Sequence, residues 1–174
     1  VRGFVKKQTG DLHLELDLGR HGKRAKVNHL RQARLSSYVG QLNVVLFSPD
    51  DLSIVKGAPR VRRRFMNMEF GQMSNRYLYD VAQYKDILQQ RNRYLRDLHY
   101  HRAHDLVYLG VLSDQLSAYG AEIIDQRHGL LKKLGKWSRA IDAEISLSTE
   151  TLRLKYVTAL RKTRWGSVNQ MYTA

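Results

Sequence analysis

Two long apolar stripes in direct succession constrain the fold of this 174-residue chain more than any other feature. The first stripe recurs at alternating intervals of four and three residues, which is the spacing of one helix face. Its members are Tyr77, Val81, Tyr84, Leu88, Arg91, Leu95 and Leu98. The members of the second stripe are Leu109, Leu112, Leu116, Tyr119, Ile123, Leu130, Leu134, Trp137, Ile141 and Ile145. Because the connector around residues 99–104 is short, the pattern predicts an antiparallel helical hairpin.

Aromatic, glycine and histidine residues within this hairpin qualify the prediction. We expect the aromatic side chains on the stripes to pack between the helices rather than stack on bases; these are Tyr77, Tyr84, Tyr119 and Trp137. Four glycines each lower helix propensity by about 1 kcal/mol, so we expect a kink or break; these are Gly110, Gly120, Gly129 and Gly135. No carboxylate cluster accompanies His99, His101 and His104, so we predict solvated histidines and no metal site.

The residues before and after the hairpin have the patterns of strands. Four leucines between Leu12 and Leu18 alternate with polar residues, which predicts a strand with one buried face. Partner strands are predicted within Gly3–Gln8 and around Arg24–Asn28, which makes an antiparallel sheet. The apolar run Gln41–Phe47 predicts a central strand buried on both faces, and residues 151–160 predict a strand that returns to the sheet. The predicted class is therefore α+β, a sheet with an inserted helical lobe.

A short helix is predicted between the sheet and the hairpin. Ser48 can cap it, Pro49 fits its first position, and Asp50 and Asp51 fall in its first turn, where the helix dipole favours negative charge. It should end near Lys56 and Gly57. We therefore divide the chain into a sheet-rich part (1–58), a helical lobe (59–148) and a return to the sheet (149–174).

The net charge of +14 indicates a polyanionic partner, because Lys and Arg that neutralise phosphates release condensed counterions. Residues 1–64 hold fourteen Lys and Arg against five acids, residues 65–148 eleven against ten, and residues 149–174 five against one. The two ends are basic and the middle is nearly neutral. The absence of cysteine excludes disulfides and thiol chemistry, and a reduced cytoplasmic location is expected.

The segment 49–67 carries a specific resemblance. A proline and an acid precede two aliphatic residues, a glycine, a small residue and a proline; then come a pair of arginines, an aromatic residue and an aliphatic one. The residues that fill these places are Pro49, Asp50, Ile54, Val55, Gly57, Ala58, Pro59, Arg62, Arg63, Phe65 and Met66. This pattern resembles the first signature of the RecF family, and the rest of the chain is similar to the middle of that family. Asn67 departs from the pattern, since the family has an acid there.

The resemblance implies part of an ATPase head of the ABC and SMC type, with an inserted helical lobe. It implies a protein of DNA replication, recombinational repair and the SOS response that binds single-stranded and gapped DNA. The family forms ATP-dependent homodimers with Mg and works with recombination mediator proteins. Its phosphate loop would precede Val1, and its ABC signature and Walker B strand would follow Ala174. This chain has no G-x-x-x-x-G-K-[ST] loop, so we expect no catalytic residue and no bound ATP here, although the longer protein would be a weak DNA-dependent ATPase.

Basic residues are the candidate DNA contacts. The signature arginines can contact phosphates, or one or two of them can pair with Asp50 and Asp51 and brace the lobe junction. The full set of candidates is Arg60, Arg62, Arg63, Arg64, Lys56, Lys23, Arg24 and Lys26, with Arg161, Lys162 and Arg164 as secondary ones. Asp50 occupies a junction comparable to the ATP-sensing Q-loop of ABC heads, and it is equally explained as a helix N-terminal acid.

Two other functions fit parts of the sequence. A non-catalytic RNA-binding or ribosome-associated module would have a similar charge and helical arm, but the signature segment argues against it. A structural coiled-coil connector does not explain why the positive charge is concentrated at the sheet-forming ends.

Overall fold

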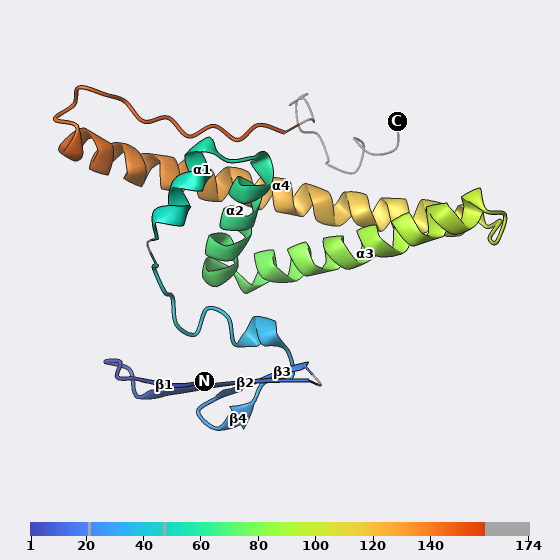
Figure 1. The fold of residues 1–174 in the computed structure, drawn as a ribbon, viewed down its shortest axis with the longest axis horizontal. Coiled ribbons are helices and arrows are strands. Elements are labelled where there is room, and N and C mark those ends of the chain that lie inside the picture. The colour runs from blue at the N-terminus through green and yellow to red at the C-terminus, as the bar shows by residue number, and fades with distance from the viewer. Residues whose placement is uncertain (21, 47, 159–174) are drawn as a thin grey trace. The chain divides into compact units, whose positions relative to one another are not determined.

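The computed structural model describes residues 1–20, 22–46 and 48–158, and of Asp50 its backbone only (Figure 1). The described chain forms four strands followed by two short 3₁₀ helices and four α-helices. It divides into two compact units, Val1–Tyr79 and a second that begins at Asp80. The predicted α+β class is confirmed. Among the described residues, no helix is both long and apolar enough to cross a membrane.

The sheet is an antiparallel meander in the order β1-β2-β3-β4. It comprises β1 (Arg2–Val5), β2 (Leu12–Gly19), β3 (Gly22–Val27) and β4 (Leu30–Arg31). The predicted strand β2 is confirmed, but its leucine face is buried only at the start: Leu12 and Leu14 are buried, whereas Leu18 is 64% exposed. The sequence did not predict β4. A two-residue turn joins it to β3, and both turn residues, Asn28 and His29, have the positive φ that such turns require.

The predicted central strand over Gln41–Phe47 is wrong. Residues 41–46 form no strand, and Val45 and Leu46 are 94% and 83% exposed; Phe47 lies outside the described residues. The segment is instead held at single points, where the Val44 amide donates to Gln72 Oε1 (3.0 Å) and Lys7 Nζ donates to the Gln41 carbonyl (2.8 Å). An apolar run of this kind forms a buried strand only when other strands flank it, and no described strand pairs with this one.

The helical hairpin is confirmed as α3 (Asn75–His99) and α4 (Leu106–Ile145), which lie side by side in Figure 1. Three contacts set the antiparallel register. Gln126 Nε2 donates to Asp80 Oδ2 (2.8 Å), and Arg91 Nε, the polar member of the first stripe, donates to Ser113 Oγ (2.9 Å). Near the connector, the rings of Tyr94 and Tyr108 meet edge to face at 4.8 Å. The two helices are called the arm below.

The second apolar stripe is covered over only part of its length. Leu112 and Ile123 are buried, whereas Trp137 and Ile141 are 58% and 56% exposed, so the prediction that Trp137 packs between the helices is wrong. The reason is length, because the 25 residues of α3 extend about 38 Å and the 40 residues of α4 about 60 Å. Tyr77 on the first stripe is fully buried, as expected for core packing, and its ring meets Phe70, which precedes the hairpin. The expected break at the glycines is also wrong, since α4 is continuous.

The predicted returning strand is absent from the described residues 151–158. These residues run back along α4 as irregular chain, where the Leu152 amide donates to Asp142 Oδ2 (2.8 Å). Farther on, Arg127 Nη1 donates to the Tyr156 hydroxyl (3.3 Å), and the Tyr156 ring meets His128 edge to face at 5.5 Å. Alternating residues thus pack on a helix here instead of joining a sheet.

Candidate nucleic-acid interface

The signature segment folds into two short helical pieces that lead into a longer helix. The 3₁₀ helix η2 (Pro49–Leu52) continues into α1 (Ser53–Lys56), and α2 (Pro59–Met73) follows after Gly57 and Ala58. The predicted helix start is confirmed in outline, because the Ser48 amide donates to Asp51 Oδ2 (2.8 Å) and the Asp51 amide donates to the Ser48 carbonyl (2.9 Å). Proline begins α2 at its first turn, where its missing amide hydrogen is not needed.

Arg62 braces the turn between α1 and α2. Its Nη1 donates to the carbonyls of Ile54 (3.1 Å) and Gly57 (2.9 Å), which lie at the C-terminal end of α1. A cation is favourable there, because these carbonyls lack helical partners and carry the negative end of the dipole. Glycine is required at position 57, since a Cβ would collide with the Ser53 carbonyl oxygen. Bracing was one of the two predicted roles, but Arg62 braces backbone carbonyls and not the expected acids.

The other three signature arginines share one face of α2. At 100° per residue, positions 60, 63 and 64 fall within about 100° of the helix circumference, and position 62 lies on the opposite side. Arg60, Arg63 and Arg64 are all exposed. Among the described residues they form no ion pair, and the first turn of α2 contains no acid. We call these three residues the arginine face.

The same face of α2 continues into a packed junction with the start of α3. Phe70 is buried, and its ring meets Tyr77 edge to face at 5.8 Å. The Tyr77 hydroxyl donates to Asn67 Oδ1 (2.8 Å), and the absence of a Cβ on Gly71 leaves room for Leu78. Asn67, the residue that departs from the family pattern, therefore has a structural partner. Its acceptor oxygen is what an acid at this position would also supply.

The candidate cations of the sheet lie on two opposite faces. Because side chains alternate along a strand, Lys23 shares the leucine face with Ala25, whereas Arg24 and Lys26 point to the polar face. There Lys26 lies opposite Glu15, and Arg24 lies opposite Asp17. The sequence placed these three cations in one group, but β3 does not present them as one surface.

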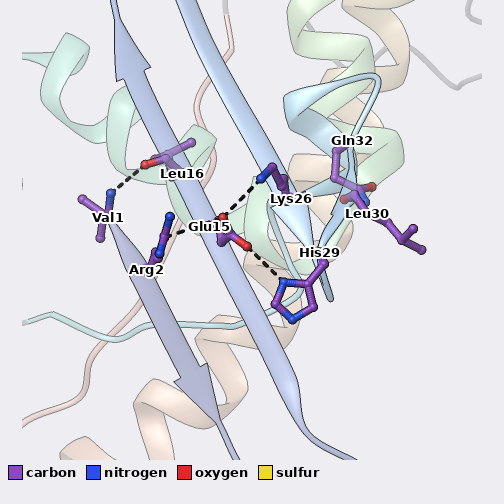
Figure 2. Close-up of polar contacts among 8 residues, drawn as sticks. All are labelled: Val1, Arg2, Glu15, Leu16, Lys26, His29, Leu30 and Gln32. Carbon is purple, nitrogen blue, oxygen red and sulfur yellow. Dashed lines mark hydrogen bonds and ion pairs between the residues drawn. The ribbon is translucent and has the colours of Figure 1, made fainter.

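Glu15 is an acid on the polar face of the sheet that pairs with neighbouring basic groups. Figure 2 shows its carboxylate between three basic groups: Lys26 Nζ at 3.4 Å, Arg2 Nε at 3.7 Å and His29 Nδ1 at 3.2 Å. Desolvation raises the pKa of Glu15, but the hydrogen bond and charge of Lys26, the hydrogen bond of His29 and the charge of Arg2 outweigh it, so the net pKa is lowered. The carboxylate therefore stays ionised and holds Lys26 in place.

Lys56 is exposed at the end of α1. The backbone of Asp50 belongs to η2, but its side chain lies outside the described residues, as do Arg161, Lys162 and Arg164. Among the described residues no group of three or more His, Asp or Glu could hold a metal ion. The role of Arg62 and the junction at Asn67 could not be found from the sequence, because both depend on contacts across a turn.

Comparison with known proteins gives the relatives of the chain. No protein-family model matches it. It is 53% identical over 173 residues to the DNA replication and repair protein RecF of Latilactobacillus sakei subsp. sakei and 54% identical over 174 residues to that of Pediococcus pentosaceus. These alignments cover 99% and 100% of the chain and 46% of each relative.

A solved structure supports the same relationship. The structure of the recombination mediator protein RecF-ATP in the RecFOR pathway matches with a TM-score of 0.77 and 28% identity, over 84% of this chain and 39% of that one. The predicted α+β fold, an antiparallel sheet followed by a helical hairpin, is therefore shared with this solved relative. The chain spans a little under half of the length of the curated relatives that it matches, and it belongs to the RecF family.

Proposed function

We propose that this chain is the DNA-facing part of a RecF-type protein of DNA replication and recombinational repair. The observation that carries the proposal is identity above 50%, along the whole chain, to relatives named DNA replication and repair protein RecF. In this proposal residues 1–58 belong to the sheet-rich part of the head, residues 59–148 to the helical lobe and residues 149–174 to the segment that leads back to the head.

The arginine face is the proposed DNA contact. Three exposed guanidinium groups on one side of a helix start match phosphate oxygens without reading bases, so binding would be largely independent of sequence. Lys56, Arg24, Lys23 and Lys26 would add weaker contacts: the first three are exposed, whereas Lys26 is half-buried and partly neutralised by Glu15. Arg62 would position the arginine face by fixing the turn that precedes it.

In the intact protein, ATP would bind mainly to residues that are not among these 174. The solved relative named RecF-ATP supports nucleotide binding in the family, whereas these 174 residues contain no phosphate loop. We propose that the intact protein is cytoplasmic, binds ATP with Mg, dimerises with it, and joins recombination mediators in the response to DNA damage. Asp50 is the residue of this chain proposed to lie near the nucleotide.

The test is DNA binding by the intact protein, with and without ATP. Anisotropy of labelled gapped DNA, single strands and duplex should show binding that strengthens with ATP and weakens steeply with salt. Matched RNA should compete less well than gapped DNA. Tighter binding to RNA than to any DNA would favour an RNA-binding module instead and would reject the proposal.

A further inference from the structure

The tip of the arm carries a cluster of arginines and histidines that the proposed interface does not use. Residues 91–105 include four arginines, three histidines and two aspartates. Six exposed residues make up the arm tip: Arg96, His99, Tyr100, His101, Arg102 and His104. The connector lies at the end of α3 and α4, where the chain reverses (Figure 1). A local excess of positive charge is therefore concentrated at one end of a nearly neutral arm.

The charges of the arm tip are not neutralised within the described chain. None of its arginines or histidines forms an ion pair with a described residue. Asp105 caps α4, because its Oδ1 accepts from the amides of Val107 (2.9 Å) and Tyr108 (3.1 Å). The Asp105 carboxylate therefore stabilises the N-terminus of α4 and forms no ion pair with the neighbouring arginines. The cations remain available to an anionic partner.

The connector is held in a defined shape. The Tyr94 hydroxyl accepts from the Asp105 amide (3.1 Å) and donates to the Asp105 carbonyl (3.0 Å), so one side chain of α3 fixes the start of α4. The ring of Tyr94 also packs on Tyr108. At the other end of the connector, the Arg102 amide donates to the Asp97 carbonyl (2.8 Å). A partner would therefore meet a preorganised surface, which lowers the entropy cost of binding.

Tyr100 gives the arm tip a flat aromatic surface. The residue is 62% exposed, and the guanidinium carbon of Arg102 lies 5.4 Å from its ring centroid. The His99 ring meets it edge to face at 5.1 Å. Planar cationic and aromatic groups placed together are what unpaired bases stack on, while the cations attract the backbone. A run of Asp and Glu alone would match the charge but would offer no ring to Tyr100.

We propose that the arm tip is a second nucleic-acid contact, which binds single-stranded nucleic acid through base stacking on Tyr100 and phosphate contacts from Arg102 and Arg96. The inference rests on the proposed function, because it adds to the same protein a contact for the unpaired strand. It gives the arm a role distinct from that of the arginine face, which contacts backbone without needing exposed bases.

The test measures anisotropy of a labelled mixed-sequence single strand and of the matching duplex with the intact protein. Tyr100→Ala should weaken single-strand binding on the order of tenfold, whereas Tyr100→Phe, which keeps the ring, and duplex binding should stay at the wild-type level. Arg102→Gln should lower the single-strand salt slope by about 0.7. The matched control is Arg139→Gln, an exposed arginine of α4 away from the tip, which should change neither.

The outcomes separate this inference from the proposed function. If wild type binds duplex and gapped DNA but Tyr100→Ala binds single strands as wild type does, only the arm-tip inference is rejected. If wild type binds no nucleic acid, the proposed function itself fails. If the tip variants lose binding of polyglutamate and keep all nucleic-acid binding, the tip is a surface for acidic proteins and the inference is overturned.

Discussion

One face of α2 is packed against other residues in the C-terminal half of the helix and exposed to solvent in the N-terminal half. In the C-terminal half, Asn67 and Phe70 pack against Tyr77 at the start of α3. In the N-terminal half, the arginine face projects into solvent. The difference teaches that the packed half fixes the direction in which the exposed half points. A rigid support of this kind is what allows surface arginines to contact a regular array of phosphates without a large entropy cost.

The largest expected effect comes from breaking the packed half. Phe70 is 3% exposed, so Phe70→Ala should lower the free energy of unfolding by about 3 to 5 kcal/mol through lost burial and a cavity. Met68, on another face of the same helix, is 54% exposed, and Met68→Ala should cost no more than about 0.5 kcal/mol. Chemical denaturation of the intact protein measures both. Equal effects of the two substitutions would mean that the junction does not support α2.

A smaller effect is expected at Asn67. Asn67→Ala removes the acceptor of the Tyr77 hydroxyl, and because Tyr77 is fully buried, the loss should cost about 1 to 3 kcal/mol. Asn67→Asp restores the family residue and keeps an acceptor oxygen, so it should cost less than Asn67→Ala. The same denaturation experiment compares them. A more damaging Asn67→Asp would show that this chain requires a neutral side chain at the position.

The smallest effect concerns the sheet, where Arg2 and Lys26 pair with Glu15, whereas the arginine face of α2 forms no ion pair with a described residue. The pKa of Glu15 is lowered from an ordinary value of 4.5, so its ion pairs stabilise the fold above that value. This contribution should be lost as the pH falls through the lowered pKa. Denaturation midpoints of wild type and Glu15→Gln, compared from about pH 7 down to about pH 3, should therefore converge in acid. A difference that persists or grows in acid would contradict the assigned role of Glu15.

The sequence predicted those parts of the fold whose patterns are satisfied locally. The strand β2 and the helices α3 and α4 each have a partner within a few tens of residues, and these elements are confirmed, although Leu18 and the end of the second stripe are exposed. The patterns at 41–47 and 151–160 predict strands, but a pattern of apolar residues does not say which element lies beside it. A strand at 41–47 would require flanking strands, and none is described there. Residues 151–158 pack against α4 instead of pairing with a strand.

The sequence predicted which residues make up the candidate site, but not which of them brace the fold and which are free to contact DNA. The sequence shows the cluster of Arg60, Arg62, Arg63 and Arg64. It does not show that Arg62 is the one that braces the turn, because that role depends on its hydrogen bonds to the carbonyls of Ile54 and Gly57. Likewise the pairing of Lys26 with Glu15 depends on strand register. Net charge indicates a polyanionic partner, but interactions within the fold decide which cations are left to meet it.

The salt dependence of duplex DNA binding tests the central claim most directly. In the intact protein, replacing Arg60, Arg63 and Arg64 together with Ala should reduce the slope of log affinity against log salt by about 0.9 for each phosphate that the variant no longer neutralises. Arg62→Ala, on the opposite side of α2, should lower stability and leave the slope unchanged. An unchanged slope in the triple variant would contradict the assignment of the arginine face as the DNA-binding surface.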